Sequence, residues 1–386
     1  MTLLNNWKVF NKTGKHRVLI TKMLPGRVWL DILLQMDYMV EVNNSKEVTT
    51  KKELINKIGN NCKAVIGQLT ENWDLELFQV LRNAGGEVYC NYAVGYDNVN
   101  VEAATENHIA ICNTPGVLTE TTAEMTLALT LACARRIVEA DKFMRNGKFN
   151  GWLPNLFLGK RLCGKIVGII GAGRIGSNYG LMMTRAFHMD LIYFDSTKSI
   201  EFEKEMDSYN DYLKTINCDP VKMKLADSVE EVLQTADVVS LHTPLIKETY
   251  HLITADRLSM MKTDAILINT SRGPIINEAV LAEYCRDNTS FKVGLDVFED
   301  EPFINKNLKK LPNVIITPHI ASATGWTREG MARLAALNVK GILENFPAWE
   351  SDNIDPFLKE QPPKSIPGIV NAELLNDSYI NPNNIN

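Results

Sequence analysis

The stretch Lys165-Ile-Val-Gly-Ile-Ile-Gly-Ala-Gly-Arg-Ile-Gly176 decides the fold of this chain. A short apolar segment runs into glycines at Gly171, Gly173 and Gly176, and an amphipathic segment follows them. In a strand–turn–helix unit, the first glycine permits the tight turn, the second lets the backbone approach a pyrophosphate, and the third lets the helix pack closely on the strand. A second apolar segment then ends at Asp195, where a carboxylate can accept hydrogen bonds from ribose hydroxyls. Together these features predict a dinucleotide-binding domain rather than an ordinary turn between a strand and a helix.

Length and composition narrow the class of protein. With 386 residues, the chain is too long for one ordinary hydrophobic core, so we expect two domains. The net charge of -5 argues against a broad surface for nucleic acid or for an anionic membrane. The longest apolar run, around 125–134, is well short of the ~20 residues that span a bilayer, and it predicts a buried helix.

Cysteine and histidine usage argues against a metal or disulfide framework. The seven cysteines are dispersed without a CxxC or CxxxC spacing, which indicates reduced thiols in a reducing compartment. The six histidines show no ligand spacing either, so no metal site is expected. We predict no signal peptide at the N-terminus and no peroxisomal tripeptide at the C-terminus. The expected location is the cytoplasm, with the peroxisome as the alternative.

Strand-like and helix-like segments alternate along nearly the whole chain, which is typical of α/β layers around parallel sheets. We expect residues 1–118 to form one domain and residues 119–324 to form the dinucleotide-binding domain. A long Ala-rich helix over 120–145 would carry the chain between them. Residues 325–386 would return to the first domain through a helix over 327–343, and the tail from Gln361 would be extended or partly disordered.

Three residues with catalytic chemistry follow predicted strands of the second domain. Arg272, Glu301 and His319 each come shortly after an apolar strand segment, where ligands bind in open α/β sheets. A guanidinium can hold the carboxylate and carbonyl oxygen of a 2-oxo acid in bidentate fashion. A histidine can supply the proton when hydride reaches the carbonyl carbon, and a carboxylate beside the imidazole fixes its tautomer. For one residue alone a structural role would compete, but three at successive strand ends favour hydride transfer.

Five sequence blocks resemble the D-2-hydroxyacid dehydrogenase family. In the second domain they are Thr270-Ser-Arg-Gly-Pro-Ile-Ile-Asn277, Gly294-Leu-Asp-Val-Phe-Glu-Asp-Glu-Pro302 and Thr317-Pro-His-Ile-Ala-Ser322. In the first domain they are Ala93-Val-Gly-Tyr-Asp-Asn-Val99 and Thr114-Pro-Gly-Val-Leu-Thr-Glu-Thr-Thr-Ala-Glu124. Within the family the chain is most similar to the plant-type hydroxypyruvate reductases. The resemblance implies two Rossmann-like domains, a doubly wound NAD-binding sheet and a flavodoxin-like substrate domain, with the cleft between them.

The resemblance also assigns roles to single residues. It implies that Arg272 binds substrate, that Glu301 is the partner of the histidine, and that His319 donates the proton. Backbone N–H groups of Val94 and Gly95 would bind the substrate carboxylate. For the cofactor it implies contacts from Gly171, Gly173, Arg174, Ile175 and Gly176 at the pyrophosphate, Asp195 at the adenosine ribose and Asp296 near the nicotinamide, with Thr122, Thr243, Thr270 and Ser322 as weaker candidates.

Asp195 and an apolar segment at 152–158 bear on the choice of cofactor and on the oligomeric state. A carboxylate at Asp195 repels a 2′-phosphate, so NADH is expected over NADPH, although Lys198 close by could soften this preference. The family resemblance favours a homodimer. The apolar arm Trp152–Leu158 could cover a partner subunit, with a local lid on the core as the alternative.

The expected activity is NADH-dependent reduction of hydroxypyruvate to D-glycerate, and of glyoxylate to glycolate. A 3-phosphoglycerate dehydrogenase would need extra cations near 68–73, where the chain has Glu71 and Asp74 instead. A formate dehydrogenase is disfavoured because that enzyme has a glutamine in place of Glu301. A non-catalytic NADH-sensing binding protein is the alternative of another class.

Overall fold

The computed structural model describes residues 6–372, and the chain divides into two compact units. The first unit comprises the residues up to Leu118 together with those from Ala323 onward, and the second unit is Thr119–Ser322. The second boundary therefore falls two residues before the predicted one. The predictions of no signal peptide and no C-terminal tripeptide concern residues 1–5 and 384–386, which lie outside the described residues.

The second unit is built on a seven-stranded parallel sheet with the order β13-β12-β11-β10-β7-β8-β9. Read from β9 and numbered from β7, this is the doubly wound order 3-2-1-4-5-6 with one more strand. The direction of strand addition reverses between β7 and β10, and ligands bind at such a point. The strands are β7 (Ile166–Ile170), β8 (Asp190–Phe194), β9 (Met223–Leu225), β10 (Val238–Leu241), β11 (Ile266–Asn269), β12 (Lys292–Leu295) and β13 (Val314–Ile316).

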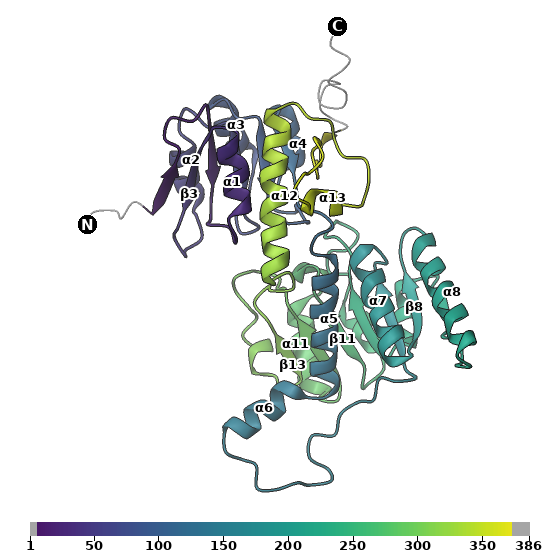
Figure 1. Cartoon of the computed structure of the whole chain (residues 1–386). Helices are drawn as coiled ribbons and strands as arrows, with labels where there is room; N and C mark the ends of the chain where they lie inside the picture. The colour runs from purple at the N-terminus through teal and green to yellow at the C-terminus, as the bar shows by residue number, and fades with distance from the viewer. Residues whose placement is uncertain (1–5, 373–386) are drawn as a thin grey trace. The chain divides into compact units, whose positions relative to one another are not determined.

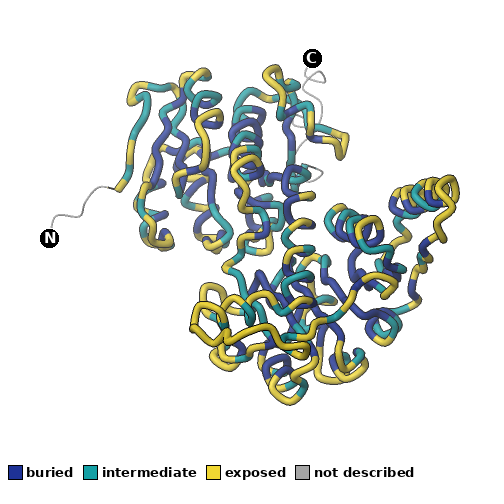
Figure 2. The backbone as a smooth tube through the Cα atoms, turned by 60° about the horizontal axis from the view of Figure 1, so that its bottom comes forward, coloured by how far each residue is buried: buried dark blue, intermediate teal, exposed yellow. Residues whose placement is uncertain are grey.

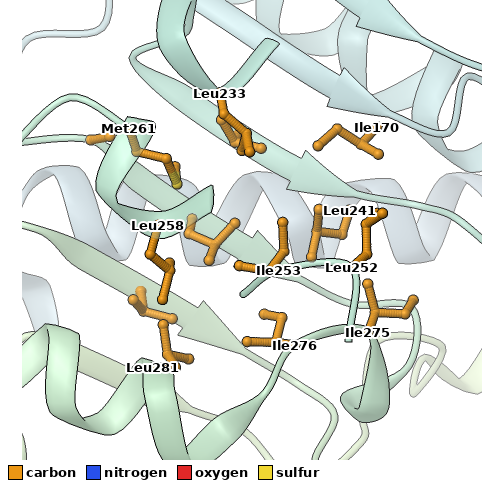
Figure 3. Packing of buried hydrophobic residues seen from close by; sticks show 14 of the residues in the cluster. Ile170, Leu233, Leu241, Leu252, Ile253, Leu258, Met261, Ile275, Ile276 and Leu281 are labelled. Atoms are coloured by element: carbon orange, nitrogen blue, oxygen red, sulfur yellow. The ribbon is translucent and has the colours of Figure 1, made fainter. Parts of the chain in front are cut away.

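Helices cover both faces of this sheet because its strands are apolar on both sides. Val238 packs in one hydrophobic cluster and its neighbour Val239 in the other, as strand alternation requires. The first cluster includes residues of α5 (Thr119–Ala134), α7 (Arg174–Phe187) and α8 (Ile200–Thr215). The second includes residues of α9 (Val229–Thr235), α10 (Ala255–Met260) and α11 (Glu278–Asp287), and Figure 3 shows its Leu233, Leu258 and Leu281 gathered around strand residues such as Leu241.

The prediction of one long helix over 120–145 is wrong, because the chain forms two helices there. α5 ends at Ala134, and α6 (Ile137–Arg145) begins after Arg136, whose φ of 55° is left-handed. The Arg136 guanidinium bonds to Glu139 in the first turn of α6 at 2.6 Å and lies over the ring of Phe157. Both helices contain apolar residues, so their pattern concealed the break.

The first unit has a six-stranded sheet with the order β1-β3-β2-β4-β5-β6, in which only β1 is antiparallel to its neighbour. From β3 onward this is the flavodoxin-like order 2-1-3-4-5. The strands are β1 (Trp7–Phe10), β2 (His16–Ile20), β3 (Tyr38–Asn43), β4 (Ala64–Gly67), β5 (Val88–Asn91) and β6 (Ala110–Cys112). In each sheet the central strands are buried, whereas the edge strands β1, β9 and β13 are less buried (Figure 2).

Two helix layers enclose the first sheet. One layer is α2 (Lys51–Ile58), α3 (Leu75–Asn83) and α4 (Val101–Glu106), whose buried residues form a cluster with Leu19, Val65 and Tyr89. On the other side α1 (Val28–Gln35) packs along α12 (Gly325–Leu343), the helix that returns to this unit (Figure 1). The segment 361–372, expected to be extended or partly disordered, is placed against β6, where Ile369 bridges Cys112 and Ile366 is fully buried.

None of the helices within residues 6–372 has the length and hydropathy needed to span a bilayer.

Candidate active site

The glycine-rich turn of the second unit has the geometry that a bound pyrophosphate requires. Gly171 directly follows β7 and has a φ of 95°, and a Cβ there would lie 2.7 Å from the backbone of His242. Gly176 passes so close to the carbonyl of Gly171 that a Cβ would lie 2.0 Å from its oxygen. A Cβ at Gly173, by contrast, would have no atom within 4 Å, so this residue leaves open space directly before α7. Arg174 and Ile175 are the first residues of that helix, whose N-terminal N–H groups can receive an anion.

Asp195 is fixed at the end of β8 by the glycine-rich turn itself. Its Oδ2 accepts the N–H of Ala172 at 2.7 Å, and its Oδ1 accepts the hydroxyl of Ser196 at 3.2 Å. The amine of Lys198 lies 2.7 Å from Glu203, whose other oxygen accepts the hydroxyl of Tyr193. The cation that could have attracted a 2′-phosphate is therefore already paired with an acid.

The threonines predicted to bind the cofactor differ in their surroundings. The Thr270 hydroxyl is 2.8 Å from that of Thr126, which itself bonds to the carbonyl of Thr122. The Thr243 hydroxyl is buried, and within residues 6–372 it has no hydrogen-bond partner. A buried unpaired hydroxyl beside the glycine-rich turn suits a polar cofactor atom. Ser322 is the last residue of the second unit and is half-buried.

The three predicted catalytic residues follow three neighbouring strands. Arg272, Glu301 and His319 come after β11, β12 and β13, which lie side by side in the sheet. His319 Nδ1 lies 2.8 Å from Glu301 Oε2, while Glu301 Oε1 accepts the N–H of Phe298 at 3.0 Å. Burial alone would raise the pKa of Glu301, but the hydrogen bond and charge of His319, the Phe298 N–H and the charge of Arg272 lower it. The acid is therefore held ionised beside the imidazole.

Asp296, predicted to lie near the nicotinamide, uses both carboxylate oxygens to build the loop that contains His319. Oδ1 accepts the hydroxyl of Thr317 at 2.6 Å and the N–H of Ile320 at 2.9 Å, and Oδ2 accepts the N–H of Ala321 at 2.7 Å. The side chain is fully buried. His319 itself has a left-handed φ of 53°, a conformation that needs such support in a residue other than glycine.

In the first unit the peptides of Val94 and Gly95 are oriented by their neighbours. The carbonyl of Ala93 accepts the N–H of Thr114 at 2.8 Å, and the carbonyl of Val94 accepts the side-chain amide of Asn113 at 2.8 Å. Because N–H and C=O point in opposite directions across a trans peptide, both bonds turn the N–H groups of Val94 and Gly95 to the other side. Successive N–H groups presented in this way form a site for an anion such as a carboxylate.

The sequence did not predict the residues that support the His319 loop and the peptides of Val94 and Gly95. The bracing role of Asp296 and the part of Asn113 in orienting Val94 were not predicted, although both residues lie directly at strand ends.

Among residues 6–372 no group of three His, Cys, Asp or Glu side chains could hold a metal ion. The seven cysteines are free thiols, and five of them are buried.

Comparisons with known proteins converge on one family. The profile of the family described as "D-isomer specific 2-hydroxyacid dehydrogenase, NAD binding domain" matches residues 127–321. "Glycerate dehydrogenase HPR, peroxisomal" from Arabidopsis thaliana is 53% identical over 372 residues, which cover 95% of this chain and 96% of the relative. "Glyoxylate reductase" from Thermococcus litoralis is 40% identical over 331 residues, covering 84% of this chain and 93% of the relative. The crystal structure of the TT0316 protein from Thermus thermophilus has a TM-score of 0.76 and 37% identity, covering 92% of this chain and 99% of that chain.

Proposed function

Because the chain belongs to the D-isomer-specific 2-hydroxyacid dehydrogenase family, we propose that it reduces hydroxypyruvate to D-glycerate with NADH, and glyoxylate to glycolate. The observation that supports this most is the 2.8 Å contact between His319 and an ionised Glu301. Arg272 follows the adjacent strand of the same sheet. To reduce a 2-oxo acid, an enzyme needs a proton donor for the carbonyl oxygen and a cation for the carboxylate, and the His319–Glu301 pair and the Arg272 guanidinium can provide these.

The proposed mechanism assigns one task to each side chain. The reduced nicotinamide supplies the hydride when it is bound. Arg272 holds the substrate carboxylate and orients the carbonyl group. His319 donates its proton from Nε2 to the carbonyl oxygen, because Nδ1 is already engaged by Glu301. The anionic Glu301 favours the protonated imidazole before the reaction and fixes its orientation throughout.

We assign NADH rather than NADPH as the preferred cofactor, with the turn around Asp195 as the reason. The Asp195 carboxylate is held toward the glycine-rich turn by the Ala172 N–H, and it would repel a 2′-phosphate there. Lys198 could neutralise that phosphate only by leaving Glu203.

We also propose a homodimer in which the segment 137–158 covers a partner subunit. This segment includes α6 and the arm that follows it, and most of its large apolar side chains are exposed, Trp152 to 81%. The exposed residues are Ile137, Val138, Met144, Phe149, Trp152, Leu153 and Leu158. Light scattering of the Trp152→Ser, Leu153→Ser double variant should show loss of the dimer, and an unchanged mass would contradict the proposal.

The seven free thiols support a reducing compartment. We propose the cytoplasm, with the peroxisome, which the printed name gives for the Arabidopsis relative, as the alternative. Imaging of the tagged full-length chain would separate the two locations.

The proposed activity is tested with a substrate panel on the purified chain. NADH and NADPH oxidation is measured with hydroxypyruvate, glyoxylate, pyruvate and phosphohydroxypyruvate, and His319→Asn serves as the catalytically impaired control. We expect the highest kcat/KM for hydroxypyruvate with NADH. Tight NADH binding without turnover of any acid would instead indicate a binding protein, and a preference for phosphohydroxypyruvate would indicate a phosphoglycerate dehydrogenase.

A further inference from the structure

A second histidine–carboxylate pair lies in the same unit as the catalytic residues. His251 Nε2 is 2.5 Å from Glu299 Oε1, and both side chains are about one-quarter exposed, at 26% and 25%. His251 comes after β10 and Glu299 comes after β12. The ring of Tyr250 stacks on that of His251 at 4.1 Å. Neither member of this pair has a part in the mechanism described above.

Glu299 is also joined to the start of α11 by a reciprocal exchange with Glu278. The N–H of Glu299 donates to Glu278 Oε1 at 2.6 Å, and the N–H of Glu278 donates to Glu299 Oε2 at 3.2 Å. The second oxygen of Glu278 accepts the N–H of Asn305 at 3.4 Å. The segment 299–305, which contains Glu301, is thus attached to α11 at both of its ends.

The same contacts reach the segment that contains Arg272. The N–H of His251 donates to the carbonyl of Pro274 at 2.8 Å. Gly273, directly after Arg272, passes so close to the segment after β12 that a Cβ would lie 1.9 Å from the carbonyl carbon of Phe298. Hence the pair connects the loops after β10 and β12, and the backbone N–H of His251 joins the loop after β11 to them. Two of these three loops present catalytic residues.

We propose that His251 and Glu299 are positioning residues, which hold Glu301 in contact with His319 and keep the Arg272 segment against it. This inference rests on the proposed function for the roles of Glu301, His319 and Arg272. Glu299 acts through the backbone, since it lies two residues before Glu301 in a turn closed by the bond from the Phe298 N–H to Glu301 Oε1.

The charges around Glu299 explain why the histidine is needed. Burial raises the pKa of Glu278 on α11, and the like charges of Glu299 and Asp300 raise it further, although the N–H groups of Glu299 and Asn305 partly oppose this. His251 is the group that contacts Glu299 from the segment after β10. Without it, two neighbouring carboxylates would repel each other at the base of the catalytic loop.

The test compares Glu299→Ala with the wild-type full-length chain. We expect kcat for hydroxypyruvate to fall by about tenfold or more, and the alkaline limb of the kcat profile to move to lower pH, because Glu301 no longer favours the protonated His319. The dissociation constant of NADH should stay unchanged. Glu299→Gln, which keeps an acceptor for the Glu278 N–H, should recover most of the activity, and His251→Asn should act in the same direction as Glu299→Ala.

Two comparisons separate positioning from a general loss of structure. Glu231→Ala is the matched control, because Glu231 also accepts a backbone N–H, that of Asp227 at 2.9 Å, and pairs with Lys224, beside β9 at the opposite edge of the sheet. It should leave the pH profile unchanged. In a Glu301→Gln background, Glu299→Ala should no longer move the alkaline limb. An equal movement in both backgrounds, or a wild-type profile in Glu299→Ala, would overturn the inference.

A readout independent of turnover distinguishes this inference from the proposed function. Ring ¹⁵N spectra, with His319 assigned through His319→Asn, report which nitrogen carries the proton. At a pH above the alkaline limb, where the imidazole is neutral, we expect a single tautomer protonated at Nδ1 in the wild-type chain and a mixture of tautomers in Glu299→Ala. An unchanged spectrum would overturn the positioning role even if all four 2-oxo acids failed as substrates, which would contradict the proposed function alone.

Discussion

The backbone carbonyl of Asp296 accepts the N–H of His319 at 2.8 Å, so one residue holds the proposed proton donor through its main chain and the rest of the loop through its side chain. Asp296→Asn should disrupt this arrangement, because an amide nitrogen cannot accept the N–H groups that a carboxylate oxygen accepts. We expect kcat to fall by about a hundredfold, the scale of a small misplacement of a catalytic group.

Steady-state kinetics with hydroxypyruvate and fluorescence titration with NADH check this prediction. Thermal melting is the control, since a fully buried acid also contributes to stability. A variant that keeps its kcat would show that the loop is held without the Asp296 side chain.

Glu301→Gln should shift the alkaline limit of reduction to lower pH. The glutamine keeps the shape of the side chain but removes the negative charge that favours the protonated His319. The measurement is kcat/KM across the pH range, with the acidic limb as the internal reference. A profile that superimposes on that of the wild type would argue against the His319–Glu301 pairing as the functional couple.

The cofactor preference should respond to Asp195 and to Glu203 by different routes. Asp195→Ala removes the repulsion of a 2′-phosphate and should raise the NADPH/NADH ratio of kcat/KM by about tenfold, equivalent to ~1.4 kcal/mol. Glu203→Gln should raise the ratio by a smaller factor, because it releases Lys198 from its 2.7 Å contact.

The control for the second route is the Lys198→Gln, Glu203→Gln double variant, which should lose the gain. If the double variant keeps it, Glu203 acts by its own charge and not through Lys198. A wild-type ratio that already favours NADPH would refute the assignment of Asp195.

Asn113→Ala should weaken substrate binding while leaving the backbone of its own segment in place. The bond from its amide to the Val94 carbonyl is lost, and the Gly95 N–H is no longer oriented. A net loss of ~1 kcal/mol per hydrogen bond predicts a rise of about fivefold in KM for hydroxypyruvate, with kcat and the KM of NADH little changed.

Asn107→Ala is the matched control for this variant, because its amide also bonds to one backbone carbonyl of the first unit, that of Ala103 at 2.8 Å. An equal effect of the two variants on KM would mean that only stability had changed.

The buried carboxyl of Glu71 should make the stability of the first unit fall as the pH approaches neutrality. Burial raises the pKa of Glu71 from 4.5 to about 7, although hydrogen bonds from the Gln68 N–H and the Trp73 indole partly oppose this. Because the pKa of Glu71 is higher in the folded than in the unfolded chain, the stability that this residue contributes is fully present below the unfolded pKa of 4.5. It is lost as the pH rises through the folded pKa of about 7. Above that pH, Glu71→Gln should stabilise the protein by about 3 kcal/mol.

Urea unfolding at several pH values, followed by a signal from the first unit, measures this difference. The gap between variant and wild type should close below pH ~4.5, where both side chains are neutral. A gap that is constant with pH would show that Glu71 is not the titrating group.

Sequence reasoning located the parts of the fold that depend on local pattern. The glycine-rich turn and the apolar strands of the two sheets follow from spacing alone, and so does the return of the chain through α12. The edge strands β1, β6 and β9 have only three or four residues each, too few for the alternation of apolar and polar residues to identify them. The break at Arg136 was missed because apolar residues continue on both sides of it.

The candidate site divides in a similar way between groups that react and groups that support them. The placement of Arg272, Glu301 and His319 after neighbouring strands was predictable, because each follows an apolar strand segment in the sequence. Their catalytic roles remain a prediction. The supporting roles of Asp296, Asn113 and Glu299 depend on which atom accepts which backbone N–H, and this is decided by tertiary contacts far apart in sequence.

The position of α12 also determines the order in which the protein can be completed during synthesis. Its buried residues, among them Met331, Leu334 and Ile342, complete the core of a unit whose strands are all made within the first 118 residues. A ribosome must therefore translate the whole of Thr119–Ser322 before the earlier unit obtains its last helix. The inserted unit is therefore the first that can close its core, while one helix layer of the amino-terminal sheet still consists of α1 without α12.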